Sequence, residues 1–123
     1  MERKEFYKQL KSFLRELIVV FPEDDDALLA ITTSLNLAII DDDCNEIAIK
    51  FYTVLNPHEK LILKRDKSIF TKIKWDSLSY ESNLFEKLNS QWNTFSVTNQ
   101  TVIWEYINVL YILSKYTINL NLS

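Results

Sequence analysis

The sequence contains no glycine among its 123 residues, and this absence limits the folds open to the chain more than any other feature. Glycine takes positive φ at low cost, so phosphate-cradling loops, strained nucleophile turns and type I′ hairpins become unfavourable without it. Apolar residues recur instead at helical spacing along nearly the whole chain. The sequence therefore predicts an all-α fold.

The ends of the first three helices are indicated by residues that stop or start helical geometry. Pro22 disfavours helical geometry at the residue before it, so the first helix is expected to end at Phe21. The second helix, whose first turn follows an acidic run, is expected to end near Ile40. Asp43 and Glu46 have the spacing of a capping box, which predicts the start of a third helix.

A proline-containing boundary lies in the middle of the chain. Asn56 is an N-cap residue, and Pro57 and Glu59 follow it at the first and third helical positions. This order predicts a short fourth helix that ends near Lys64. Residues 65–79 have a weaker apolar pattern and are interpreted as a loop with one helical turn.

The C-terminal part of the chain contains the most apolar helix. Ser79 and Thr98 are the predicted N-caps of the last two helices. Residues 107–113 are also compatible with a strand, but the helical pattern around them is longer. Apolar residues cover more than half of the last helix, as in an element packed on several sides. We therefore expect a compact bundle of about five or six helices with the C-terminal helix central.

Length and composition indicate one domain over residues 1–123. The net charge of −3 and the sequence pI of about 5.1 argue against a surface wholly covered by nucleic acid. Cys44 is the only cysteine, no signal-peptide pattern is visible, and no apolar stretch is long enough to span a membrane. We expect an intracellular protein without membrane contact.

The acidic runs and the few metal-ligating side chains predict no metal centre. Aligning Asp41 with the first position of an EF-hand loop puts Glu46 where glycine is required and Tyr52 where the bidentate glutamate belongs. Cys44 and His58 supply only two candidate zinc ligands. No catalytic spacing is recognisable, and the usual glycine-rich nucleotide loops are absent. We therefore expect no metal, no cofactor and no enzymatic activity.

Residues 60–74 form the most strongly charged segment, with six basic residues and a single acidic one, Asp66. The candidate nucleic-acid-binding residues are Lys60, Lys64, Arg65, Lys67, Lys72 and Lys74. Because Phe70 and Trp75 lie in or beside the segment, its cations could follow a phosphate backbone while bases stack on the rings. The favoured interpretation is a solvated lysine-rich loop whose aromatic rings point into the core.

Aromatic residues make up 13% of the chain, which is many for its length. Most of them are expected to pack in the core. Four of them fall at the edges of apolar stripes and are the candidate partner-binding residues: Tyr7, Tyr52, Tyr80 and Trp104. The acidic and basic residues are also segregated along the chain, which favours oriented contact with a protein partner or another copy.

Three stretches of the sequence have a pattern in common with known proteins: residues 6–24, residues 56–70 and residues 103–107. Together they resemble a short uncharacterised family of large nucleocytoplasmic DNA viruses. The resemblance implies a small accessory or virion-associated protein made in the host cytoplasm, and it supplies no functional residues. Our leading hypothesis is a non-enzymatic interaction module, possibly self-associating, and the alternative is a nucleic-acid-associated protein that uses residues 60–74.

Overall fold

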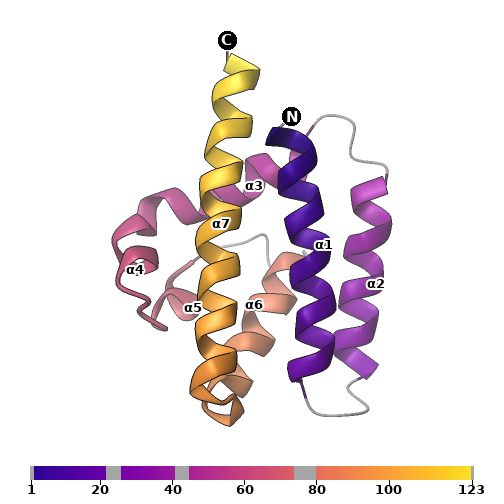
Figure 1. Cartoon of the computed structure of the whole chain (residues 1–123), viewed down its shortest axis with the longest axis vertical. Coiled ribbons are helices and arrows are strands. Elements are labelled where there is room, and N and C mark those ends of the chain that lie inside the picture. The colour runs from indigo at the N-terminus through magenta and orange to yellow at the C-terminus, as the bar shows by residue number, and fades with distance from the viewer. Residues whose placement is uncertain (1, 22–25, 41–44, 74–79, 123) are drawn as a thin grey trace.

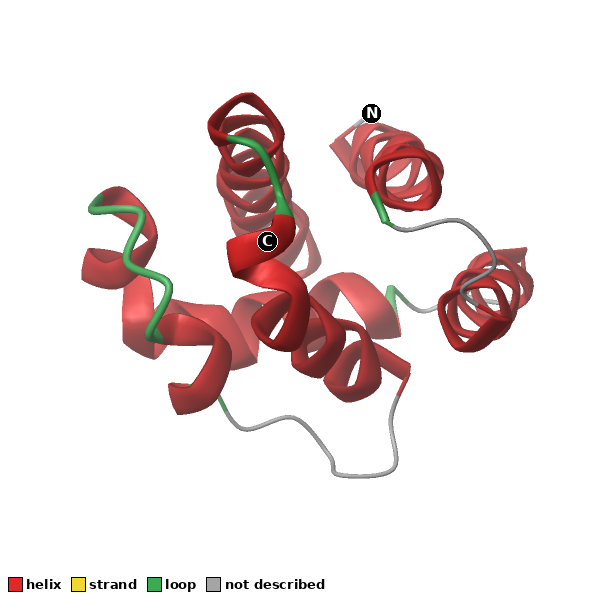
Figure 2. Cartoon of the chain, turned by 90° about the horizontal axis from the view of Figure 1, so that it is seen from below, coloured by secondary structure: helices red, strands yellow, loops and turns green. Residues whose placement is uncertain are grey.

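The computed structural model describes residues 2–21, 26–40, 45–73 and 80–122, and no strand occurs among them (Figures 1 and 2). The described elements, in chain order, are α1 (Glu2–Val20), α2 (Asp26–Ile40), α3 (Glu46–Leu55), η1 (Asn56–His58), α4 (Glu59–Leu63), α5 (Ile69–Lys72), α6 (Tyr80–Gln91), η2 (Trp92–Thr94) and α7 (Val97–Leu122), where η marks a 3₁₀ turn. The predicted all-α class is therefore confirmed.

Helix α7 is central to the bundle, as the sequence predicted. It runs along α1 and also contacts α3 and α4, while α2 packs on α1 and α6 (Figure 1). Its buried side includes Ile103, Ile107 and Leu110, which repeat at steps of three and four and therefore share one face. The helix is fully buried on that face only, and its opposite side is exposed.

Helix α1 shows how the apolar spacing becomes packing. Its fully buried residues are Phe6, Leu10, Phe13, Leu14 and Leu17. They lie on one face because they are three or four positions apart, and that face contacts α7. The helix ends at Val20, as expected from the proline that follows.

Two of the described residues take the left-handed conformation that glycine would adopt more cheaply. Asn45 precedes α3 with φ 60°, and Arg65 follows α4 with φ 54°. The amide of Arg65 donates to Ile62 O, and the amide of Asp66 donates to Leu61 O. These two bonds form a Schellman motif with arginine at the position where glycine is usual. The predicted cap Asp43 lies outside the described residues.

Two predicted helix starts are wrong. Asn56 does not cap α4, because α3 continues directly into η1 and the Asn56 side chain bonds to a residue of α7 instead. Thr98 does not cap α7, because the helix begins one residue earlier and the Asn99 amide donates to Ser96 Oγ at 3.1 Å. A cap needs the right spacing to the first free amides, and Ser96 has it.

A cluster of buried aromatic rings brings several elements together. Phe70 of α5 lies 5.1 Å from Trp92 and 5.5 Å from Trp104, measured between ring centroids. Phe85 of α6 lies 6.0 Å from Phe70. These offset contacts join the short α5 helix to α6 and α7 and explain why much of the aromatic content is buried.

Candidate interaction surfaces

Two of the four aromatic residues predicted to contact a partner belong to the core. Tyr7 is buried and packs edge-on against Phe6, with ring centroids 5.2 Å apart. Trp104 is only 5% exposed and lies 5.5 Å from Trp92. Neither ring is on an accessible surface. Both residues lie at the edge of the apolar face of their helix, and in α1 and α7 this edge faces a neighbouring helix. Their burial contradicts the assignment of these two residues as partner-binding candidates.

The structure describes the side chain of one of the other two aromatic candidates. Tyr52 is half-buried on α3 and stacks on Tyr111 of α7, with a centroid distance of 6.3 Å and an interplanar angle of 4°. Tyr80 is the first residue of α6, and its side chain lies outside the part of the chain that the structure describes. Among the candidates whose side chains are described, Tyr52 is therefore the one that stays partly accessible.

The sequence did not reveal an exposed apolar strip on α7. The strip consists of Val102, Tyr106, Val109, Ile112, Leu113 and Tyr116. Val109 is 37% exposed, Ile112 41% and Tyr116 53%, while the remaining members are partly buried. Five of the six members follow one another at steps of four, three, four and three, the spacing of a helix–helix seam. We call these six residues the α7 strip.

A shallow groove between α1 and α7 adjoins this strip. It has a volume of about 290 Å³ and is lined by Gln9, Val102, Glu105, Tyr106 and Val109. The Tyr106 ring in this lining is held in place by packing against Phe13 of α1, with the ring centroids 5.3 Å apart. The groove extends the accessible apolar surface from α7 toward α1.

A second, larger groove lies between α2 and α6, with a volume of about 540 Å³. It is lined by Ala27, Ala30, Ile31, Ser34, Asn83, Glu86, Lys87 and Ser90. Small side chains at one-turn spacing keep the two helices from filling the space between them. The accessible lining is mainly apolar, but Ile31 is the one large aliphatic side chain among the lining residues, beside two alanines and several polar residues.

The predicted basic residues do gather on one surface, formed by α4, α5 and the turn between them. Lys60, Lys64, Arg65, Lys67 and Lys72 are all exposed, and we call these five the basic surface. Lys74 and Trp75 lie outside the described residues. Phe70 is buried, so the predicted stacking of bases on this ring is wrong, and the favoured inward orientation of this ring is confirmed.

The acidic residue within the basic surface is held by the backbone. Asp66 Oδ1 accepts a hydrogen bond from the Ser68 amide at 3.0 Å. This bond, followed by the Ser68 side chain and the charges of Lys72 and Lys64, lowers the pKa of Asp66. The carboxylate therefore organises the turn into α5 and stays charged.

Tyr111 forms polar contacts with residues that are more than fifty positions away in the sequence. Its hydroxyl lies 2.8 Å from Asn56 Oδ1 and 2.5 Å from Glu59 Oε2. Burial, and then the hydrogen bond and charge of Glu59, raise the pKa of Tyr111. A phenol held protonated is a donor rather than a base, so the cluster joins α7 to η1 and α4 and is poorly suited to proton abstraction.

The described residues include no group of three or more His, Cys, Asp or Glu side chains placed to bind a metal ion. The acidic runs at 23–25 and 41–43 fall outside that part of the chain. No described helix is long and apolar enough to cross a membrane. Comparisons with protein-family models, curated proteins and solved structures gave no match to this chain.

Proposed function

We propose that this protein is a non-enzymatic interaction module that self-associates by packing the α7 strips of two copies against each other. The observation that carries the proposal is the α7 strip itself. A contiguous apolar face left exposed on a small protein marks a contact site, whereas single exposed apolar residues do not. Ile112 and Tyr116 would lose most of their remaining contact with water in such a pair.

A second copy is the occupant that the strip fits best. The alternation of four and three residues lets two identical helices interdigitate their side chains. Glu105 is the single charged residue among those that line the adjoining groove, so most of this contact would come from apolar and uncharged side chains. A two-fold contact uses the same patch on both copies and closes on itself, which gives a dimer rather than a filament.

The size of the strip limits the strength of the dimer. Val102 to Tyr116 spans about 21 Å at 1.5 Å per residue. A standard interface buries about 800 Å² on each partner, and one helix face of this length supplies less. The groove beside Gln9 therefore has to contribute, and we expect a dissociation constant on the order of micromolar.

Sedimentation velocity over a range of protein concentrations tests this proposal. The unmodified chain should change from monomer to dimer as its concentration rises, and Ile112→Glu should remain a monomer. Leu37→Glu is the matched control, because Leu37 is an exposed apolar residue of α2 (60%) outside the strip. A monomer at every concentration, or loss of the dimer in the control instead, would refute the proposed surface.

We also propose an intracellular, viral and virion-associated setting for this module. This part rests on the sequence resemblance alone. If a virus encodes the chain, mass spectrometry of purified particles and of the soluble cytoplasmic fraction should detect it. Absence from the particles would remove the virion-associated assignment and leave the self-association proposal intact.

A further inference from the structure

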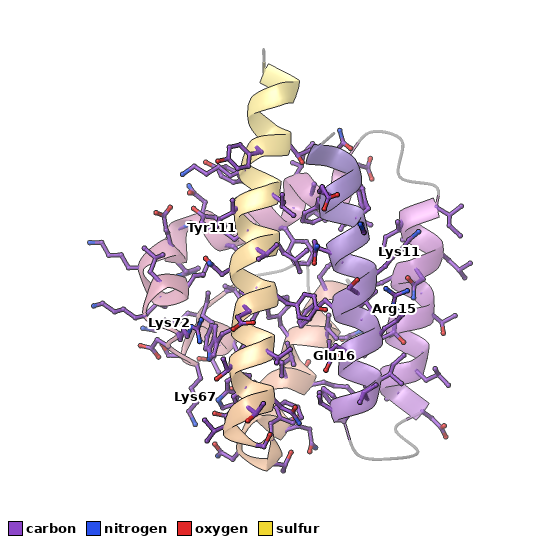
Figure 3. All side chains as sticks on the ribbon, in the orientation of Figure 1. Lys11, Arg15, Glu16, Lys67, Lys72 and Tyr111 are labelled. Atoms are coloured by element: carbon purple, nitrogen blue, oxygen red, sulfur yellow. The ribbon has the colours of Figure 1, made fainter. Side chains whose placement is uncertain are left out.

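The basic surface is a continuous group of exposed cations on short, firmly packed elements. Lys60 and Lys64 are one turn apart at α4, and Lys72 ends α5. The elements are anchored from below, because Ile62, Ile69 and Phe70 are buried. In Figure 3, Lys67 and Lys72 extend outward on the side of the molecule away from α1 and α2. The charged side chains are thus exposed to solvent, while the helices that carry them are packed on the core.

The two acidic residues within residues 59–72 are already engaged. Glu59 accepts the hydroxyl hydrogen bond of Tyr111, and Asp66 accepts the amide hydrogen bond of Ser68. The two carboxylates still offset part of the positive charge. Residues 59–72 contain five cations and two carboxylates, so this segment stays positive. The whole chain has a net charge of −3, so an anion is attracted to the basic surface and not to the molecule as a whole.

The composition of the surface indicates a phosphate backbone rather than a protein. Protein interfaces are anchored by buried aromatic and apolar residues, and lysine is depleted in them. Here four of the five cations are lysine, Phe70 points inward, and Leu63 is the one large apolar residue that is exposed over residues 59–72. Nucleic-acid backbones need only accessible cations, and lysine supplies them as point charges.

We propose that the basic surface binds the phosphate backbone of nucleic acid, without base stacking and without sequence preference. With Phe70 buried, the described part of the surface offers charge and no exposed aromatic platform. The contact therefore differs from single-strand binding, in which aromatic rings carry much of the affinity. Duplex and single strand should bind comparably, and this inference does not depend on self-association through the α7 strip.

The number of cations sets an upper limit on the salt dependence. Each phosphate contact on duplex DNA contributes about −0.9 to the slope of log affinity against log salt concentration. Five contacts from Lys60, Lys64, Arg65, Lys67 and Lys72 would give a slope of about −4.5, or roughly a 500-fold loss for a fourfold rise in salt. Removing two contacts should reduce the magnitude of the slope by about 1.8.

Two charge-matched double variants separate a local contact from a net-charge effect. Lys67→Glu/Lys72→Glu alters the basic surface, and Lys11→Glu/Arg15→Glu makes the same change of charge on α1. Figure 3 shows these pairs on opposite sides of the molecule, and all four side chains are exposed. Fluorescence anisotropy with a labelled mixed-sequence duplex, at several salt concentrations, gives the affinity and the slope. The circular dichroism of each variant checks its folding.

The expected result is a large loss of affinity and of slope for the Lys67/Lys72 variant, with the Lys11/Arg15 variant close to the unmodified chain. Equal losses in both variants would show that only net charge matters and would overturn the assignment. No binding at low salt, or equal inhibition by polyglutamate and by unlabelled duplex, would also overturn it. Much tighter binding to a single strand than to the duplex would show that bases do stack on the protein, which contradicts the proposal.

Discussion

The contact between Tyr111 and η1–α4 gives the sharpest test of the fold, because one atom joins elements more than fifty positions apart. Tyr111→Phe removes the hydroxyl that donates to Glu59 and leaves the ring in place. The ring still stacks on Tyr52 and remains buried, so no cavity forms. The variant therefore isolates the hydrogen bond from the packing.

The expected loss can be estimated from the exposure of the two acceptors. A hydrogen bond to a charged group contributes about 1.5–3 kcal/mol when its partner is left without water. Asn56 is exposed and Glu59 is only half-buried, so water can replace much of the lost bond. We therefore expect the free energy of unfolding to fall by about 1–2 kcal/mol.

Urea denaturation measures this quantity directly, and a shift of the midpoint with an unchanged slope is required. Glu59→Gln and the double variant complete a cycle, in which the two losses should be less than additive because they remove the same bond. Tyr52→Phe is the control for removing a hydroxyl beside the same rings. Strictly additive losses, or a loss in Tyr111→Phe no larger than in Tyr52→Phe, would refute the reasoning.

Two further predictions follow from the hydrogen bonds. Ser96→Ala should lower the free energy of unfolding by about 1 kcal/mol in urea denaturation, while Thr98→Ala should leave it nearly unchanged, because Ser96 caps α7. Stability should also fall as the pH rises above about 10: the unfolded phenol of Tyr111 then loses its proton while the folded phenol, whose pKa is raised, keeps it. Absorbance titration should show a late-ionising tyrosine that is missing from Tyr111→Phe, and identical high-pH titration curves for the two proteins would contradict this.

Local signals in the sequence were sufficient for the helices and for several of their ends. The stop before Pro22 depends on the geometry of adjacent residues, and α1 does end at Val20. The end of α4 near Lys64 was also predicted within a residue. These predictions succeeded because the physical cause lies within a few positions of its effect.

The surfaces were harder to predict, because they depend on which helix covers which face. Asn56 has the right chemistry for a cap, but its partner Tyr111 is fifty-five positions away in sequence. The apolar residues of α7 were interpreted as packed on several sides, whereas no described element covers Ile112 and Tyr116. Apolar periodicity identifies the faces of a helix and cannot decide which of them a neighbour will bury.

Arg65 connects the glycine-free composition to the basic surface, and it separates stability from binding. A non-glycine residue with φ 54° costs about 1–2 kcal/mol relative to a favourable backbone, partly offset by the greater freedom of glycine in the unfolded chain. Arg65→Gly should therefore raise the free energy of unfolding by about 1 kcal/mol, while Arg65→Gln keeps the strain. Both variants lose the same charge, so both should weaken duplex binding equally. A lower free energy of unfolding in Arg65→Gly would refute the strain at this turn, and a clear difference in duplex affinity between the two variants would refute the view that the lost charge alone weakens binding.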